Sequence, residues 1–259
     1  MLTTNFSIYN LEYYLLIFVR IAGVMSVAPI YGTRGVPRRV RLGLALCIAA
    51  LVASVTDYTP LNYTTIIGYT VLIVKEAVMG LSIGLAANLC MTIINLAGMF
   101  IDREMGLTMV TEFDPTTNAS VTVSAEFYTY AVLLLMLCTN MHHFIIQAIC
   151  DSFQVVPVGG AIWDGESLYS IAVTFIQQYF VIGFRISLPI FISITLLNVV
   201  LGVLAKTAPQ MNMFSIGIEL KLGLGLIVMI GTIYFLPSIT EFVYQMTEDI
   251  VQSLIRTMY

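Results

Sequence analysis

The sequence predicts an all-α membrane protein, and three observations lead to this class. Hydrophobic residues make up 59% of the 259-residue chain and charged residues only 10%. Because a soluble domain has roughly a quarter charged residues, this chain has too few charges to cover a water-facing surface. Its apolar residues form long stretches, and a bilayer crossing needs about 20 of them. Charged residues inside those stretches then have to face protein or water rather than lipid.

Six apolar stretches are expected to form helices, at 13–31, 42–56, 64–101, 121–150, 168–204 and 213–237, followed by an amphipathic tail over 238–259. No basic cluster precedes the first stretch, and Glu12 and Arg20 interrupt it, which favours a retained helix over a cleaved signal peptide. The third and fifth stretches are too long for one simple crossing, so each is either a bent hairpin or a helix that projects well beyond the hydrocarbon core. Since no Gly-Pro or Asn-Gly turn divides the third, we expect long or kinked helices there.

The basic residues predict an orientation. The only dense basic group follows the first stretch and consists of Arg34, Arg38, Arg39 and Arg41. The loops 57–63 and 151–167 contain acidic residues but no Lys or Arg. With six nominal spans, the positive-inside rule places the arginine loop in the cytoplasm and the N-terminus outside.

Several charges lie deep in apolar sequence, and two interpretations of them stay open. They form salt bridges between packed helices or subunits, or they line a transport pathway. These residues are Arg20, Lys75, Glu76, Glu126, Arg185, Glu219 and Lys221. Gly80 and Gly84 form a GxxxG pattern, and Gly98 adds another small residue, which favours close packing of helices.

No motif for catalysis or metal binding is found. The chain lacks GxSxG, HExxH, Walker A and a GxGxxG placed between strand and helix, so we expect no enzyme and no cofactor. His142 and His143 follow Cys138 without a further ligand at suitable spacing, which favours polar residues at a helix end. The basic residues form no patch with interleaved aromatic residues, so no nucleic-acid partner is expected.

Two smaller expectations concern cysteines and acids. Cys47, Cys90, Cys138 and Cys150 are scattered in apolar runs and are expected to be small buried side chains without disulfides. The neighbouring acids, Asp102 with Glu104 and Glu112 with Asp114, are expected to be solvated in a polar loop.

The segment 105–120 joins two apolar stretches yet contains large apolar side chains. Its notable residues are Met105, Gly106, Met109, Phe113, Asp114 and Pro115. One interpretation is a loop folded back into a cavity or channel, because irregular backbone at membrane depth survives only inside protein or against water. The other is an ordinary amphipathic surface loop.

Several blocks, in order along the chain, resemble the FliR family, the export-gate component of bacterial flagellar type III secretion. Its injectisome counterpart is the T component. The blocks are Arg20-Ile21-Ala22-Gly23 with Pro29, Pro37 with the arginines after it, Glu76 with Gly80 and Gly84, Ala97-Gly98, Met105-Gly106-Leu107, Phe113-Asp114-Pro115, Asp151-Ser152-Phe153, Pro157-Val158-Gly159-Gly160, and Asn198 through Asn212. The chain departs from the family pattern at Met99, Glu104 and Met141.

The resemblance implies a non-enzymatic export-gate subunit in the bacterial inner membrane, at the flagellar basal body. The implied partners are FliP and FliQ copies, FlhB and FlhA, membrane lipid, and unfolded flagellar export substrates. It implies a P-like helical region over 1–165 with a plug loop at 106–120, and a Q-like helical hairpin over 166–259. These long, kinked hairpins would assemble helically with homologous subunits, partly raised above the bilayer. Two alternatives remain: a small-molecule or ion transporter, and the T subunit of an injectisome.

Overall fold

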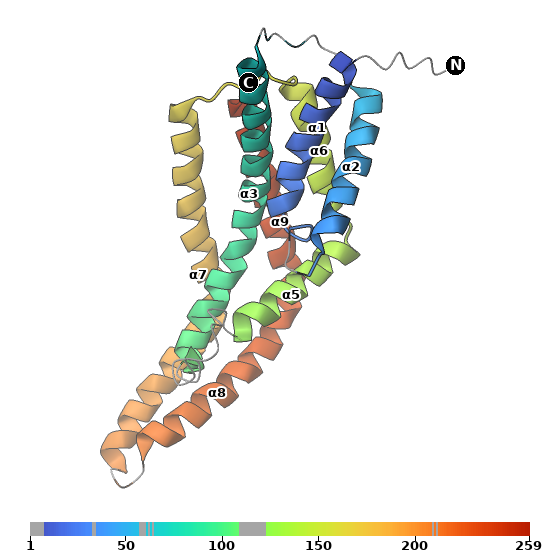
Figure 1. The fold of residues 1–259 in the computed structure, drawn as a ribbon. Helices are drawn as coiled ribbons and strands as arrows, with labels where there is room; N and C mark the ends of the chain where they lie inside the picture. The colour runs from blue at the N-terminus through green and yellow to red at the C-terminus, as the bar shows by residue number, and fades with distance from the viewer. Residues whose placement is uncertain are drawn as a thin grey trace. The chain divides into compact units, whose positions relative to one another are not determined.

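The computed structural model describes residues 8–32, 35–56, 61, 63, 65–108, 123–208, 210 and 212–259, and within them every regular element is a helix (Figure 1). The predicted all-α class is therefore confirmed. The elements are α1 (Ile8–Val27), α2 (Arg38–Val55), α3 (Ile66–Met105), α5 (Val123–Cys138), α6 (His143–Val155), α7 (Gly165–Thr207), α8 (Met213–Thr232), the 3₁₀ turn η1 (Ile233–Phe235) and α9 (Leu236–Thr257).

The chain divides into two compact units, which we describe separately. Unit 1 consists of Met1–Cys90, Asn140–Phe175 and Gln245–Tyr259. Unit 2 consists of Met91–Thr139 and Ile176–Tyr244. The P-like and Q-like regions implied by the family resemblance, 1–165 and 166–259, stay a prediction.

The two overlong apolar stretches are continuous helices, as predicted for the third stretch and as one of the two alternatives for the fifth. Helix α3 has 40 residues and α7 has 43. At 1.5 Å per residue they are about 60 and 65 Å long, roughly twice the thickness of the hydrocarbon core of a bilayer. Pro189 lies inside α7, where it has no N–H to donate to the carbonyl of Arg185, four residues earlier.

The fourth apolar stretch is not one helix, contrary to expectation. Helix α5 ends at Cys138 and α6 begins at His143. Asn140, in the turn between them, has a φ of 60°, a conformation that Asn tolerates better than most residues. The turn was missed because no Gly or Pro marks it.

Fewer helices of the described residues are long and apolar enough to cross a membrane than the six nominal spans. Within the described part of the chain, three helical segments are long and apolar enough: Ile66–Met105, Gly165–Thr207 and Phe214–Thr257. The broken pair of α5 and α6 makes a fourth if it counts as one span. The orientation that rested on six crossings is not supported by this count.

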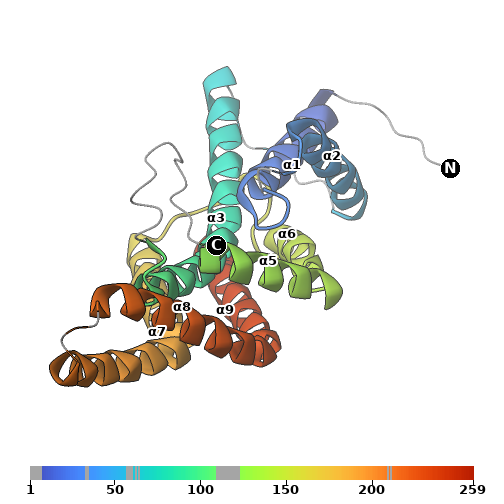
Figure 2. The same ribbon diagram turned by 90° about the horizontal axis from the view of Figure 1, so that it is seen from below.

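Unit 1 is held together by helices with buried stripes. Helices α1 and α2 pack side by side (Figures 1 and 2). The first part of α3, α6, the start of α7 and the end of α9 complete the unit. On α1 the stripe recurs every three or four residues, the spacing of one helix face, and consists of Tyr13, Leu16, Ile17, Arg20, Ile21, Val24 and Met25. On α3 it consists of Glu76, Met79, Ile83 and Ala87. Each apolar stripe thus contains one charged residue.

Two further predictions for unit 1, the arginine loop and the amphipathic tail, have different outcomes. Arg38, Arg39 and Arg41 lie in the first turn of α2, after Pro37, and not in a loop. The amphipathic tail is confirmed as helix α9. Its buried residues in this unit are Met246, Thr247, Val251, Leu254, Ile255 and Met258.

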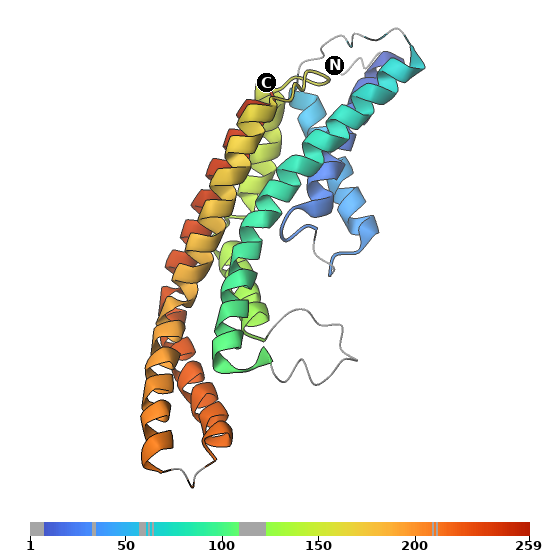
Figure 3. The ribbon, with the colours of Figure 1, turned by 90° about the vertical axis from the view of Figure 1, so that its left-hand side faces the viewer.

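Unit 2 contains the end of α3, α5 and a hairpin in which α7 runs beside α8 (Figure 3). The end of α3 packs on α7, where the ring centroids of Phe100 and Phe184 are 6.1 Å apart. The most apolar 18-residue windows of α7 and of α8–α9 are each only 17% buried within the chain, against 56% for α3. So much uncovered apolar surface requires lipid or another protein chain.

All four cysteines are free thiols. Cys90 is buried and Cys150 is half-buried, but Cys47 and Cys138 are exposed. The expectation of burial was therefore wrong for Cys47 and Cys138, because they lie on apolar helix faces that the rest of the chain leaves uncovered.

Candidate functional site

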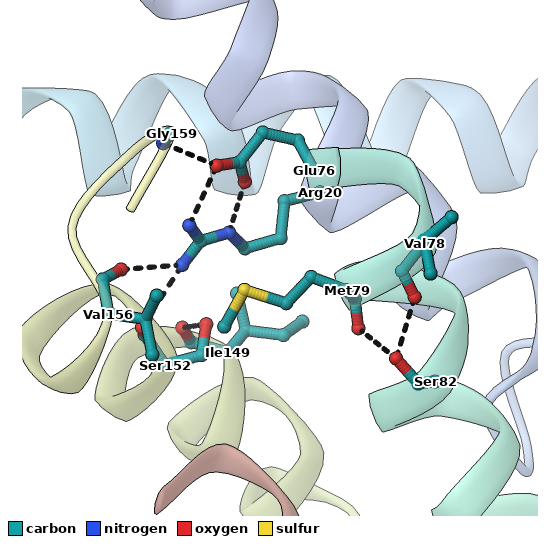
Figure 4. Close-up of polar contacts among 9 residues, drawn as sticks. All are labelled: Arg20, Glu76, Val78, Met79, Ser82, Ile149, Ser152, Val156 and Gly159. Carbon is teal, nitrogen blue, oxygen red and sulfur yellow. Dashed lines mark hydrogen bonds and ion pairs between the residues drawn. The ribbon is translucent and has the colours of Figure 1, made fainter. Parts of the chain in front are cut away.

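The central polar site of unit 1 joins Arg20 of α1 to Glu76 of α3 (Figure 4). Arg20 Nε lies 2.5 Å from Glu76 Oε2, and Nη2 donates to Oε1 at 3.0 Å. This is the parallel, two-bond geometry that suits a guanidinium and a carboxylate. Both side chains are 0% exposed. Sequence alone placed these residues 56 positions apart, and the structure brings them together.

The remaining nitrogen of Arg20 binds the end of α6. Nη1 donates to the carbonyl oxygens of Ser152 and Val156, both at 3.0 Å. These carbonyls lie in the last turn of α6 and just beyond it, at the helix end that carries partial negative charge, and the Ser152 carbonyl also accepts the N–H of Val156 at 3.0 Å. The guanidinium carbon also lies 4.1 Å from the centre of the Phe153 ring, a cation–π contact. Arg20 therefore caps α6 as well as pairing with Glu76.

Glu76 has a third partner in the turn after α6. The backbone N–H of Gly159 donates to Glu76 Oε1 at 2.7 Å. Gly159 has a φ of +81°, and the N–H of Gly160 donates to the carbonyl of Pro157 at 3.0 Å. A turn with a positive φ at its third residue favours glycine there. We call Arg20, Glu76, Ser152, Val156 and Gly159 the Arg20 clamp.

Glycines on α3 allow α1 to approach closely enough for the clamp to form. A Cβ at Gly80 would overlap the carbonyl oxygen of Arg20 itself, and one at Gly84 would lie 2.6 Å from the carbonyl oxygen of Val24. On the opposite helix, a Cβ at Gly23 would lie 3.0 Å from the backbone nitrogen of Leu81. The two backbones therefore touch along the GxxxG face, as small residues in membrane helices permit.

The Arg20 clamp connects three helices through a network of buried hydrogen bonds. Its guanidinium makes four hydrogen bonds, and Glu76 accepts three. A buried ion pair is not in itself strongly stabilising, but removing one partner leaves an uncompensated buried charge and costs about 3–5 kcal/mol. The clamp thus fixes α1, α3 and the end of α6 to one another.

A second buried polar contact lies in unit 2 and was missed at the level of sequence. Asp102 accepts hydrogen bonds from the backbone N–H of Ser124, at 2.9 Å, and from the Ser124 hydroxyl. Both residues are 0% exposed. Asp102 is in helix α3 and not in a solvated loop, so that expectation was wrong. Its carboxylate lies at the start of α5, where unpaired N–H groups favour an anion.

The same region brings the ends of α3 and α5 into contact. A Cβ at Gly98 would overlap the backbone of Ala125. We call Asp102, Ser124, Gly98 and Ala125 the loop anchor, because they hold together the two helices that flank residues 106–122. In the sequence, Ser124 precedes the mostly apolar run 127–138, which is typical of a residue near a helix start, but this pattern does not indicate its contact with Asp102.

The predicted plug residues fall partly within this region. Met105 is the last residue of α3 and is 1% exposed; a Cβ at Gly225 of α8 would lie 2.7 Å from its side chain. Gly106 has a φ of +81°. The N–H of Leu107 donates to the carbonyl of Asp102 at 2.9 Å, and that of Gly106 to Arg103 at 3.3 Å. This pair of bonds is a Schellman motif that ends the helix at a glycine.

Several predicted site residues are outside these contacts or outside the described part of the chain. Met109, Phe113, Asp114 and Pro115 lie outside the described residues. The other predicted charges make no described hydrogen bond or ion pair; they are half-buried Lys75 and Lys221 and exposed Glu126, Arg185 and Glu219. The roles predicted for all these residues in gating or subunit contact stay predictions.

His142 and His143 lie at the start of α6 with ring centroids 4.2 Å apart. Among the described residues no group of three or more His, Cys, Asp or Glu side chains is placed to hold a metal ion.

Comparison with known proteins identifies the family. The family described as bacterial export proteins, family 1, matches residues 11–247. The chain is similar to the flagellar biosynthetic protein FliR of Bacillus subtilis (strain 168), with 33% identity covering 93% of this chain and 94% of that protein. It is also similar to the proteins of that name from Pectobacterium carotovorum subsp. carotovorum, at 30% identity (92% and 90% covered), and from Escherichia coli (strain K12), at 28% (91% of each). The resemblance to the FliR family is thereby confirmed. This chain belongs to the bacterial export proteins, family 1.

Proposed function

We propose that this chain is a non-enzymatic subunit of the flagellar type III protein-export gate, where it helps to form and close the channel for unfolded flagellar substrates. The observation that carries the proposal is similarity over more than 90% of the chain to relatives named as flagellar biosynthetic proteins. Those names also favour the flagellum over an injectisome.

The exposed faces of the helices support a role inside an assembly in the bacterial inner membrane. The α7 and α8–α9 windows leave most of their apolar residues uncovered by the chain itself. Glu219 and Lys221 interrupt the apolar sequence of α8, and Lys75 interrupts that of α3, without a described ion pair. Subunits with complementary charges would complete them, and we propose FliP and FliQ copies, FlhB and FlhA as these partners.

The loop anchor supports the proposed plug. Asp102 and Ser124 fix the helices on either side of residues 106–120. These contacts hold together the two helix ends that flank this segment. We propose that this segment closes the resting channel.

Co-purification tests the assembly. The tagged chain is extracted from cells that express its membrane neighbours, and the complex is weighed by native mass spectrometry. We expect one large complex containing this chain with FliP and FliQ, and loss of flagellar export when the gene is deleted. A monomer or symmetric dimer that moves a small solute by itself would overturn the proposal in favour of a transporter.

A loop deletion tests the plug. Residues 109–120 are replaced by a short Gly-Ser linker, which retains Gly106 and the loop anchor. We expect intact assembly but leakage of small solutes, measured as ion flux in cells or vesicles. The matched control replaces the segment with the same residues in scrambled order, so that bulk is retained. If the deletion leaves permeability unchanged while the complex assembles, the plug assignment is wrong.

A further inference from the structure

A groove on unit 1 runs along the first half of α3 and is not explained by the contacts described so far. It has a volume of about 390 Å³. The segment before α7 forms one wall and is held in place by its backbone, because the N–H of Ile162 donates to the carbonyl of Met258 at 3.0 Å. We call this feature the α3 groove, lined mainly by Ile67, Val71, Val74, Val78, Lys75 and Trp163.

The apolar residues of the α3 groove belong to a longer stripe with the spacing of a helix–helix contact. Successive members are four, three, four, three and four residues apart, the alternation by which a helix presents one line of side chains to a second helix. Each of these side chains is between 43% and 77% exposed. At the α-helical rise the stripe is about 27 Å long. Its members are Ile67, Val71, Val74, Val78, Leu81 and Leu85.

Lys75 lies beside the middle of this stripe, and its ammonium makes no described hydrogen bond or ion pair. Along the helix axis it is about 12 Å from Ile67 and 15 Å from Leu85, and both distances exceed the length of a lysine side chain. Lipid headgroups at the level of Lys75 would leave half of the apolar stripe outside the hydrocarbon. Hydrocarbon over the whole stripe would instead surround the ammonium, which is costly. A protein helix with a carboxylate at this level avoids both costs.

We infer that the α3 groove binds a helix of a different subunit, which presents an apolar face of the same spacing and one Asp or Glu side chain opposite Lys75. Trp163 adds a large apolar contact beside this ion pair and excludes water from it. The inference rests on the proposed function, since it requires an assembly of different chains. It adds the surface that one neighbour occupies and the chemistry that this neighbour must have.

A second copy of this chain is the rival occupant. The α3 stripe supplies no acid to a copy of itself, because Glu76 is the only acidic residue between 58 and 101 and is buried in the Arg20 clamp. Helix α5 could supply one, since exposed Glu126 lies next to the exposed side chain of Phe127. A contact between α3 of one copy and α5 of the next joins two different surfaces, so it can repeat without closing. A gate subunit in a complex of defined size favours the different chain.

Cross-linking tests the identity of the occupant. Membranes from cells that express the whole set of flagellar export genes are treated with a membrane-permeable carbodiimide, which joins an amine to a carboxylate in direct contact. We expect Lys75 to be linked to Asp or Glu of a different chain, identified by mass spectrometry of the peptides. A link from Lys75 to Glu126 of a second copy would overturn the inference.

Variants test whether the groove is needed for assembly. Lys75→Gln should lower the yield of the co-purified complex by about tenfold when subunits are limiting, as expected for loss of a charged hydrogen bond. Lys75→Arg should retain most of the complex. Lys206→Gln is the matched control, because it removes an exposed lysine of α7 and should change the yield by less than about twofold.

Two further variants separate the charge from the apolar contact. Val74→Ser keeps Lys75 and should also lower the yield, because the exposed Val74 side chain belongs to the stripe and not to the core of the chain. Lys75→Glu should prevent assembly, and replacement of the cross-linked partner acid by lysine should restore it. Urea unfolding of each variant alone in detergent should match the wild type, which separates lost binding from lost folding.

The outcomes distinguish this inference from the proposed function. If Lys75→Gln and Val74→Ser assemble as well as the wild type, the α3 groove is not the docking site, while the proposed function stands. Equal losses in Lys75→Gln and Lys206→Gln would show a general effect of surface charge and overturn the inference. If the wild-type chain itself enters no complex with another chain, the proposed function and the inference both fail.

Discussion

Arg20 and Arg185 look alike in the sequence, since each is a single arginine in a long apolar stretch. In the structure their burial and their hydrogen bonding are opposite. Arg20 in unit 1 is fully buried and makes four hydrogen bonds, to Glu76 and to the end of α6. Arg185 in unit 2 is exposed and has no described partner. An arginine in a long apolar stretch therefore indicates that a polar or charged partner is required. Whether the chain itself supplies this partner depends on which helices lie beside the arginine.

The largest effect is expected at the Arg20 clamp. Glu76→Ala should lower the free energy of unfolding by about 3–5 kcal/mol, because it leaves a buried guanidinium without its counter-charge. Urea unfolding of the full chain in detergent, followed by circular dichroism, measures the loss. The double variant Arg20→Met with Glu76→Leu should recover most of the stability. A single variant as stable as the wild type would contradict the clamp.

A smaller loss is expected where α1 and α3 touch. Gly80→Ala places a methyl group against the carbonyl of Arg20 and should cost about 1–3 kcal/mol, because the backbones must separate. The matched control is Gly43→Ala on α2, where a Cβ meets no atom within 4 Å and helix propensity alone should give no loss or a small gain. Equal results for the two variants, by the same unfolding assay, would show that the GxxxG contact is not needed.

The loop anchor should show a loss of about 1–2 kcal/mol. Asp102→Asn retains the shape of the side chain but removes the charge at the start of α5 and presents an amide group to Ser124. Asp249→Asn is the control, since Asp249 is exposed on α9 and should change stability by less than about 0.5 kcal/mol. Hydrogen exchange of the first turn of α5 should rise in Asp102→Asn only. If it does not, Asp102 does not hold that helix end.

The smallest effect on stability is expected at Arg185, the second arginine of the comparison. Arg185→Gln should change the unfolding free energy of the chain in lipid-free detergent by less than about 0.5 kcal/mol, because no described contact is lost. A loss above about 1 kcal/mol would mean that the fold itself supplies a partner for Arg185, and the contrast with Arg20 would fail.

Much of the fold was predictable because it follows from local composition. The length of the apolar stretches predicted α3 and α7, and residues 238–259 were recognisable as an amphipathic helix. The turn at Asn140 was not predictable, since neither Gly nor Pro marks it. The burial of Asp102 was also not predictable. An acidic residue near a helix end is normally expected to be solvated, and only the structure shows that the start of α5 lies beside it.

The Arg20 clamp was also only partly predictable from the sequence. The sequence alone identified the main side chains of this site: the charged residues Arg20 and Glu76, which are costly to place against lipid, and the small residues Gly80 and Gly84, which favour helix packing. Their connection to one another, and to the carbonyls of Ser152 and Val156, depends on packing between segments up to 136 residues apart. Backbone carbonyls have no sequence signature, so this half of the Arg20 clamp could come only from the structure.

The sequence by itself determined that this protein is helical, apolar and dependent on partners for a few charges, because those properties follow from composition and spacing along the chain. The tertiary structure decided which charges the chain satisfies internally. A buried ion requires partners within about 3 Å in the right direction, and that geometry exists only where separate helices meet.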